Sequence, residues 1–342
     1  MEVPQHWVKV EGFSPDLGSS GGTVAVWGWS TESDDEALEV GRVRLAELLD
    51  RIRVEGRLPS TRGYYPRTPL REPVLEEVRG HDGRRLAVVT RNRMGCEVLC
   101  TDVLLIADVD VPELEDGAGE RRRWPSDTGG GVTSFLRRLV MGRPDPKPQD
   151  RRGEDAAGLD APPSPSAGGH GMFSAGLGGP RPATGSGGPS VAEALACEPV
   201  WEFAQRHPDL GVRVYRTRAG LRVIVTGADA PPMSERGRDI LTQLGSDPLY
   251  VELCSTHDSY RARLTPKPFR VGMAALHVGW PCPSEELERA WLRWVDEYED
   301  AALGWSTCRL ISASGPVPGE DERRLVELHD ERTRTHVRDP LA

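Results

Sequence analysis

Glycine and proline are concentrated in one stretch of the chain, and this stretch limits how the chain can fold. Residues 141–190 contain twelve glycines and nine prolines and almost no aromatic residues. Such a composition cannot bury enough apolar surface to offset the entropy that is lost when a chain becomes ordered. We therefore predict a linker or insertion at 113–190, largely disordered from residue 141, between an ordered part at 1–112 and a second one at 191–342.

The ordered part at 1–112 combines strand and helix patterns. Alternating apolar residues at 23–30 predict a strand, and Ser33 followed by Glu36 predicts a capped helix that ends at Gly56. The proline-containing residues 64–78 predict a loop. Two or three strands joined by tight turns are then expected from the apolar runs at 85–92 and 96–111.

The part at 191–342 also alternates between helix and strand patterns. Helical apolar spacing predicts helices at 190–208, 234–245, 284–303 and 319–334. Extended segments are predicted at 211–218, 221–227, 248–254, 259–268 and 306–313. We therefore predict an α+β fold in which an antiparallel or mixed sheet with flanking helices joins both parts into one core, interrupted by the Gly/Pro-rich insertion.

Charge and hydropathy exclude several classes of protein. No segment approaches the roughly 18 consecutive apolar residues that span a bilayer, and the first residues do not resemble a signal peptide. We therefore expect a soluble, cytoplasmic protein without a membrane partner. The six cysteines lack the C-x-x-C spacing of zinc sites, so we expect buried free thiols. The motifs of P-loop ATPases, serine hydrolases, zincins and Rossmann oxidoreductases are absent from the sequence.

The distribution of charge is more informative than its sum. The net charge of −10 argues against non-specific binding to nucleic acid. Residues 211–270, however, contain ten Arg or Lys against six Asp or Glu, a local excess of +4. Such a segment can hold a phosphate-bearing ligand, and it can equally be an ordinary solvated surface.

Two aspartates close an apolar run in the segment LLIADVDVP at 104–112. Because side chains at i and i+2 of a strand lie on the same face, Asp108 and Asp110 are expected to project side by side. Their negative charges repel each other unless a cation or an arginine lies between them. The sequence thus permits a metal site here, and it also permits an ion-pair cluster with the arginines of the predicted hairpin at 211–227.

In this order, the Asp-x-Asp strand, the hairpin YRTRAGLRVIVTG and the segment YRARLTPKPFR resemble the catalytic core of the archaeo-eukaryotic primase and primase-polymerase superfamily. The resemblance covers roughly residues 100–112 and 211–270. It implies an RRM-like core and nucleotidyl transfer with Mg²⁺ or Mn²⁺, acting on a nucleotide or nucleic acid. In such chemistry carboxylates hold the ions that activate the attacking oxygen and neutralise the phosphates.

The resemblance also implies a set of site residues. Asp108 and Asp110 would hold the metal, and Asp258 would complete the catalytic acids. The residues that would bind phosphate are Arg218, Arg222, Arg261, Arg263 and Lys267, since Arg and Lys are the usual partners of phosphate oxygens. Tyr215, Tyr260 and Phe269 lie in the same basic region and are candidates for stacking on unpaired bases, or for the core.

One departure from the family pattern affects the expected activity. The family's hairpin carries a histidine where this chain has Arg222, and arginine cannot act as a general base near neutral pH. The sequence therefore leaves three functions open. The first is a metal-dependent nucleotidyltransferase, the second is a non-catalytic scaffold that binds a phosphate ligand or a protein, and the third is a metal-dependent phosphodiesterase or nuclease.

Overall fold

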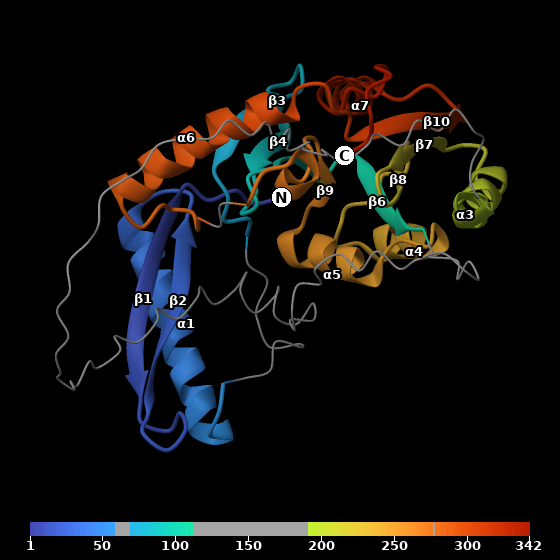
Figure 1. Cartoon of the computed structure of the whole chain (residues 1–342). Coiled ribbons are helices and arrows are strands. Elements are labelled where there is room, and N and C mark those ends of the chain that lie inside the picture. The colour runs from blue at the N-terminus through green and yellow to red at the C-terminus, as the bar shows by residue number, and fades with distance from the viewer. Residues whose placement is uncertain (59–68, 112–190, 276–277) are drawn as a thin grey trace, which may run out of the picture.

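The computed structural model describes residues 1–58, 69–111, 191–275 and 278–342 (Figure 1). The predicted insertion at 113–190 lies outside these residues. Within them, helices accompany three sheets whose strands all pair in the antiparallel sense. The fold is therefore α+β with antiparallel sheets, as the alternation of helix and strand patterns predicted.

The N-terminal residues form a two-stranded sheet covered by one helix. Strand β1 (His6–Ser14) pairs with β2 (Gly22–Ser30), and α1 (Asp34–Glu55) packs on both. Helix α1 is capped by Ser33 and ends at Gly56 in the left-handed region, as predicted. Strand β1 was not predicted. Close packing requires glycine at position 28, because a Cβ there would lie 1.8 Å from the carbonyl oxygen of Ala37.

A second sheet has the order β3-β4-β5-β9. Its strands are β3 (Val74–Arg79), β4 (Arg85–Arg91), β5 (Glu97–Thr101) and β9 (Tyr260–Arg263). The loop predicted at 64–78 is wrong for its last five residues, because Val74 to Val78 pair with β4. Strand β9 comes from the C-terminal part of the chain, so this sheet joins both parts through backbone hydrogen bonds.

The third sheet has the order β10-β7-β8-β6 and also draws on both parts of the chain. Its strands are β6 (Leu105–Asp110), β7 (Gly211–Thr217), β8 (Gly220–Thr226) and β10 (Cys308–Ser314). Strands β7 and β8 form the predicted hairpin. Strand β6, which carries the two aspartates, lies at the edge of the sheet beside β8.

The remaining helices lie around these two sheets (Figure 1). They are α3 (Val191–Arg206), α4 (Glu235–Gln243), α5 (Pro248–His257), α6 (Glu285–Ala302), α7 (Glu320–Arg332) and the short 3₁₀ helix η1 (Pro268–Val271). The extended segment predicted at 248–254 is wrong, since these residues form most of α5. Asp247 caps this helix and Pro248 occupies its first turn, where a missing N–H costs nothing.

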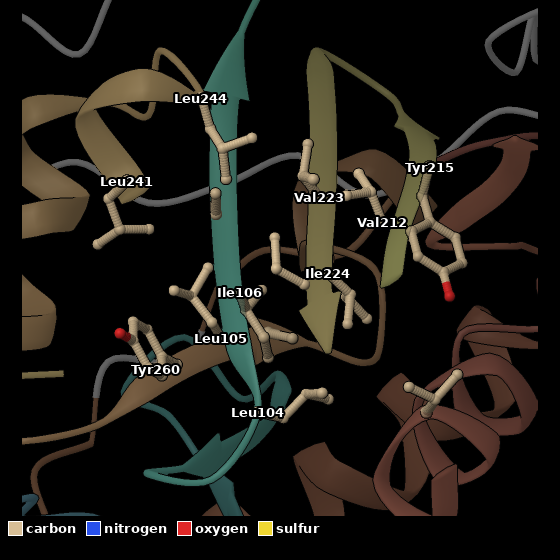
Figure 2. Packing of buried hydrophobic residues seen from close by; sticks show 14 of the residues in the cluster. Leu104, Leu105, Ile106, Val212, Tyr215, Val223, Ile224, Leu241, Leu244 and Tyr260 are labelled. Carbon is tan, nitrogen blue, oxygen red and sulfur yellow. The ribbon is translucent and has the colours of Figure 1, made fainter. Parts of the chain in front are cut away.

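The largest hydrophobic core lies between the third sheet and its helices. Figure 2 shows Leu104, Leu105 and Ile106 of the β6 region packed with residues of β7, β8, α4 and β9. Residues from both sides of the 112–190 segment are fully buried in this one cluster. The core therefore fixes β6, the β7–β8 hairpin and β9 relative to one another.

The cysteines and the helices of the described residues bear on two expectations from composition. All six cysteines are free, and all are buried except Cys282, which is partly exposed. Among the helices described, none has the combination of length and apolar character that crossing a bilayer requires.

Candidate phosphate-binding site

The predicted carboxylate pair lies where β6 meets the Arg-rich hairpin. Asp108 is opposite Arg222 of β8, and Asp110 is opposite Gly220. Nε of Arg222 donates a hydrogen bond to Oδ1 of Asp108 at 3.3 Å, and the side chain of Asp108 is 39% exposed. A Cβ at Gly220 would lie 2.4 Å from the carbonyl oxygen of Val109, so the hairpin approaches β6 this closely only with glycine.

Arg222 is buried beneath this ion pair and bonds to the interior. Its NH1 group donates to the carbonyl oxygen of Arg263 at 2.9 Å and lies 3.3 Å from Nε2 of His329. Burial alone would lower the pKa of Arg222, but the charge and hydrogen bond of Asp108, together with Cys308 and Tyr250, raise it. Arg222 therefore stays charged and holds Asp108 from inside the fold, and its guanidinium does not face solvent.

A third carboxylate approaches the predicted pair from α5. The backbone N–H of Asp247 donates to the carbonyl oxygen of Asp108 at 2.9 Å, and the hydroxyl of Ser246 donates to the same oxygen at 3.1 Å. Burial raises the pKa of Asp110, and the negative charges of Asp247 and Asp108 raise it further, whereas Lys267 opposes the shift. Three carboxylates thus repel one another at this edge of the sheet.

Asp258 is not brought to this group of carboxylates. It caps the C-terminal end of α5, whereas Asp247 caps the N-terminal end, and a helix of ten residues is about 15 Å long. The carboxylate of Asp258 pairs instead with the amino group of Met1 at 3.2 Å, which also pairs with Asp102 at 2.6 Å. Within the described residues, no group of three or more His, Cys, Asp or Glu side chains is arranged to hold a metal ion.

Arg261 is neutralised inside the fold. Its NH2 group donates to Oε2 of Glu72 at 2.6 Å, and the hydroxyl of Thr90 donates to the same oxygen at 2.7 Å. Burial alone would raise the pKa of Glu72, but the charge and hydrogen bond of Arg261 outweigh it and lower the pKa. Arg261 therefore forms a buried structural ion pair with Glu72.

Four cations that act on one another have no such partner in the part of the chain that the structure describes, and we call them the cation patch: Arg218, Arg263, Lys267 and Arg270. Among the described residues, none of the four has a carboxylate within ion-pair distance. Arg218 is exposed in the turn between β7 and β8, and the other three are partly buried. The first three were predicted from the sequence as phosphate ligands, whereas Arg270, one residue beyond the exposed Phe269, was not.

The pKa values show that these cations act on one another. Burial lowers the pKa of Lys267 to about 8, with the positive charges of Arg263 and Arg270 as the next causes. Burial likewise lowers the pKa of Arg270 to about 10, and Arg263 and Arg218 contribute. The negative charge of Asp108 acts on Lys267 in the opposite direction. The cation patch therefore carries a local excess of positive charge beside Asp108 and Asp110.

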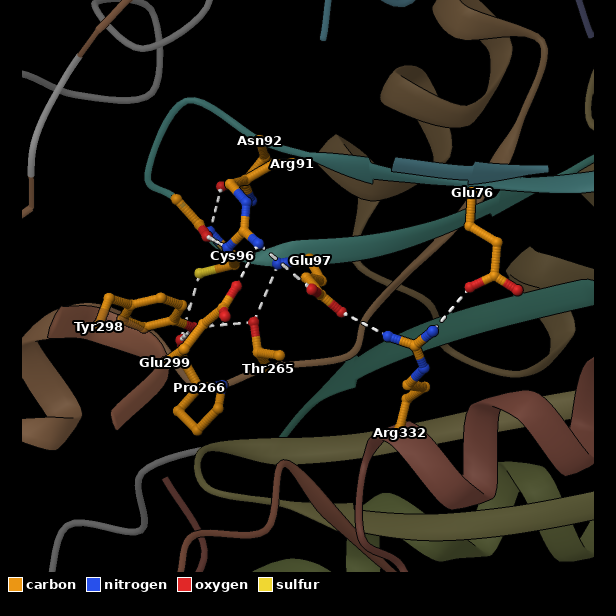
Figure 3. Close-up of polar contacts among 11 residues, drawn as sticks. Glu76, Arg91, Asn92, Cys96, Glu97, Thr265, Pro266, Tyr298, Glu299 and Arg332 are labelled. Carbon is orange, nitrogen blue, oxygen red and sulfur yellow. Dashed lines mark hydrogen bonds and ion pairs between the residues drawn. The ribbon is translucent and has the colours of Figure 1, made fainter. Parts of the chain in front are cut away.

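The segment that carries Arg263 and Lys267 is held in place from both sides (Figure 3). The hydroxyl of Tyr298 on α6 donates to the carbonyl oxygen of Pro266 at 2.5 Å and lies 2.8 Å from Oγ1 of Thr265. On the other side, the backbone N–H of Glu97 at the start of β5 donates to Oγ1 of Thr265 at 2.9 Å, and Sγ of the preceding Cys96 donates to Pro266 O at 3.3 Å. These contacts hold the segment between Arg263 and Lys267.

The charged partners of Glu97 extend this anchor. Its carboxylate pairs with Arg91 at 3.3 Å and with Arg332 of α7 at 3.3 Å, and Arg91 also pairs with Glu299 of α6 at 2.6 Å. Figure 3 shows this chain of contacts running from α6 through β4 and β5 to α7. Strands and helices from distant parts of the sequence therefore position the segment at 264–268 together.

The site contains two kinds of charged group. Its Arg and Lys side chains attract an anion, and its carboxylates attract a small cation. Arg and Lys side chains that lack carboxylate partners are suited to phosphate oxygens. Asp110 and Asp247 supply the hard oxygen ligands that Mg²⁺ and Mn²⁺ prefer, and Mg²⁺ commonly binds through one or two carboxylates together with substrate phosphates. A divalent ion held here would need further oxygen ligands, such as those of a phosphate, because the described residues contain no complete metal-binding group. No protein-family model, no curated protein and no solved structure matches the chain.

Proposed function

We propose that the protein binds the phosphates of a nucleotide or of a nucleic-acid end at the cation patch. The observation that carries this proposal is the set of cations that have no carboxylate partner among the described residues, of which Arg263, Lys267 and Arg270 are partly buried. Keeping like charges together in a folded protein is unfavourable, and a bound polyanion relieves the repulsion. We expect the protein to act in the cytoplasm.

We further propose that the bound ligand undergoes metal-dependent nucleotidyl transfer in a core of the primase-polymerase type. Support comes from an antiparallel sheet that carries Asp108 and Asp110 on its edge strand beside the Arg-rich hairpin. A divalent ion would neutralise phosphate charge and activate the attacking oxygen. Asp110 and Asp247 would hold it, Arg222 would orient Asp108, and the cation patch would hold the phosphates.

A second candidate function is a scaffold that binds the same ligand without chemistry. Two observations favour it. Asp108 is engaged by Arg222, and Asp258 lies at the far end of α5 from Asp247. A phosphodiesterase or nuclease would use the same carboxylates and would differ only in using water as the acceptor.

Calorimetric titration tests the binding step. A nucleoside triphosphate is titrated into the wild-type protein and into Arg263→Ala/Lys267→Ala, with and without Mn²⁺. Loss of two charge-assisted contacts is expected to raise Kd by about 100-fold or more. The control is Arg42→Ala/Arg53→Ala, which removes the same charge from the exposed face of α1. Equal affinity of the two double variants would contradict the proposal.

A second titration and one product assay separate the candidate functions. Asp110→Asn/Asp247→Asn is expected to abolish the gain in affinity that Mn²⁺ gives, while metal-free binding persists. Incubation with labelled nucleotide and a primed template then distinguishes the three chemistries. Extended primers indicate nucleotidyl transfer, shortened strands indicate a nuclease, and unchanged strands with intact binding indicate the scaffold.

A further inference from the structure

Phe269 is the one of the three aromatic candidates that reaches solvent. Tyr215 and Tyr260 are fully buried in the core, and the hydroxyl of Tyr260 donates to the carbonyl oxygen of Ala230 at 2.7 Å. Phe269, in contrast, is 58% exposed. Exposing a large aromatic ring forgoes the favourable burial of its apolar surface, which is of the order of 2 kcal/mol for a phenylalanine side chain.

The ring of Phe269 lies close to two members of the cation patch. Nζ of Lys267 and Cζ of Arg270 are each 5.8 Å from the centroid of the ring. Cations at this distance are attracted by the π-electrons of the ring, so the ring also helps to position them. An aromatic face therefore lies within a few ångströms of the charges that we assign to phosphate binding.

The backbone under Phe269 is as well anchored as the segment before it. Pro268 begins η1, and Gly272 ends it in the left-handed region with its N–H donated to Pro268 O. The N–H of Met273 also donates to Pro268 O at 2.9 Å, and α6 packs against η1. The indole of Trp294 on α6 donates to the carbonyl oxygen of Ala274 at 3.0 Å. An ordered turn therefore holds the ring of Phe269 in its exposed position.

We propose that the exposed face of Phe269 stacks on a nucleobase whose phosphate is bound by Lys267, Arg270 and Arg263. This inference rests on the proposed function and adds the class of ligand, namely one with an unpaired base next to its phosphate. Because every base has a π-face, such stacking tolerates any sequence. The base can belong to a nucleoside triphosphate or to the end of a single strand, and the two sources require the same chemistry.

The test compares ligands that differ only in their bases. Fluorescence anisotropy measures the binding of a labelled single-stranded oligonucleotide and of an abasic strand with the same number of phosphates. In the wild-type protein the strand with bases is expected to bind about 5- to 100-fold more tightly, the range for one stacked base. Phe269→Ala is expected to remove this difference between the two strands, whereas Phe269→Trp keeps the difference.

Phe13→Ala is the matched control, because Phe13 on β1 is 61% exposed and lies outside the cation patch. Separate titrations of the protein with ATP and with tripolyphosphate repeat the comparison for free nucleotides. Together with the strand measurements, they show whether the stacked base belongs to a free nucleotide or to a single strand. If Phe269→Ala changes neither comparison, or if Phe13→Ala has the same effect, the stacking inference is wrong although phosphate binding stands. If the wild-type protein binds neither tripolyphosphate nor any strand, the proposed function fails and the stacking inference fails with it.

Discussion

Arg261 and Arg263 are two residues apart on the same face of β9, yet they differ in what surrounds them. Arg261 is paired with Glu72 in a buried site, where the hydroxyl of Thr90 also donates to the carboxylate. Arg263 has no carboxylate partner among the described residues and lies beside Lys267 and Arg270. Arginine therefore stabilises the fold at position 261, whereas at position 263 it is available to a ligand. Sequence spacing alone treats them as equivalent, and only the tertiary partner distinguishes them.

The largest effect is expected from removing the charge of Glu72. Glu72→Gln leaves the buried guanidinium of Arg261 without a counter-ion, so the free energy of unfolding should fall by about 3 kcal/mol. Urea denaturation measures this change. Lys9 and Glu11 form an exposed pair on β1, and Glu11→Gln is the control, expected to change stability by less than about 1 kcal/mol. Equal effects of the two substitutions would remove the distinction between the two arginines.

Lowering the pH should reduce the difference in stability between the wild-type protein and Glu72→Gln. The pKa of Glu72 is lowered in the folded protein, so its contribution is present at neutral pH and is lost as the pH falls through that lowered value, below about pH 4. The stability gap between the wild-type protein and Glu72→Gln should therefore shrink in urea titrations at decreasing pH. A gap that stays constant down to pH 3 would show that the charge of Glu72 contributes nothing.

Arg263→Met should change stability little and lower ligand affinity clearly, the reverse of what is expected for Glu72→Gln. Because it removes a cation that none of the described carboxylates pairs with, the free energy of unfolding should change by less than about 1 kcal/mol. The affinity for tripolyphosphate should fall about tenfold, which corresponds to the loss of one charge-assisted hydrogen bond. Urea denaturation and calorimetry measure the two quantities on the same preparation. A large loss of stability without a loss of affinity would reverse our assignment of the two arginines.

The smallest expected effect is the pH dependence of ligand binding. The pKa of Lys267 is about 8 in the free protein, and a bound phosphate favours its charged form. Affinity for tripolyphosphate should therefore fall as the pH rises above 8, by less than the roughly tenfold that one charge-assisted contact contributes. Lys267→Arg stays charged and should give a flat profile between pH 7 and 9.5. A wild-type profile that is also flat would exclude Lys267 from the phosphate contacts.

Local signals in the sequence predicted the elements well where caps and hairpins are involved. Ser33 and Gly56 bound α1, and Ser234 begins α4, because capping depends on residues that are neighbours in the chain. The start of α5 was missed although its signal, Asp247 followed by Pro248, is present. The apolar run after Pro248 was read as a strand, since short apolar runs fit both structures.

The candidate site was predictable only in part, because its assembly depends on contacts between distant segments. Asp108 and Asp110 follow from strand periodicity, and Arg222 is opposite Asp108 because the hairpin pairs with β6. That Asp258 contacts the amino group of Met1, or that Glu72 neutralises Arg261, cannot be inferred from spacing. Asp247 joins the site through a backbone hydrogen bond that no sequence pattern indicates.

The hydroxyl of Tyr298 fixes residues 265 and 266 just before Lys267. Side chains on a loose loop would lose conformational freedom on meeting a ligand, whereas those on a fixed backbone have already lost part of it during folding. Recognition by the cation patch would then depend on α6, a helix that contributes none of the four charges. A substitution in α6 would then change the distances between the four charges, and with them the phosphate spacing that the cation patch fits. All four cations would still be present.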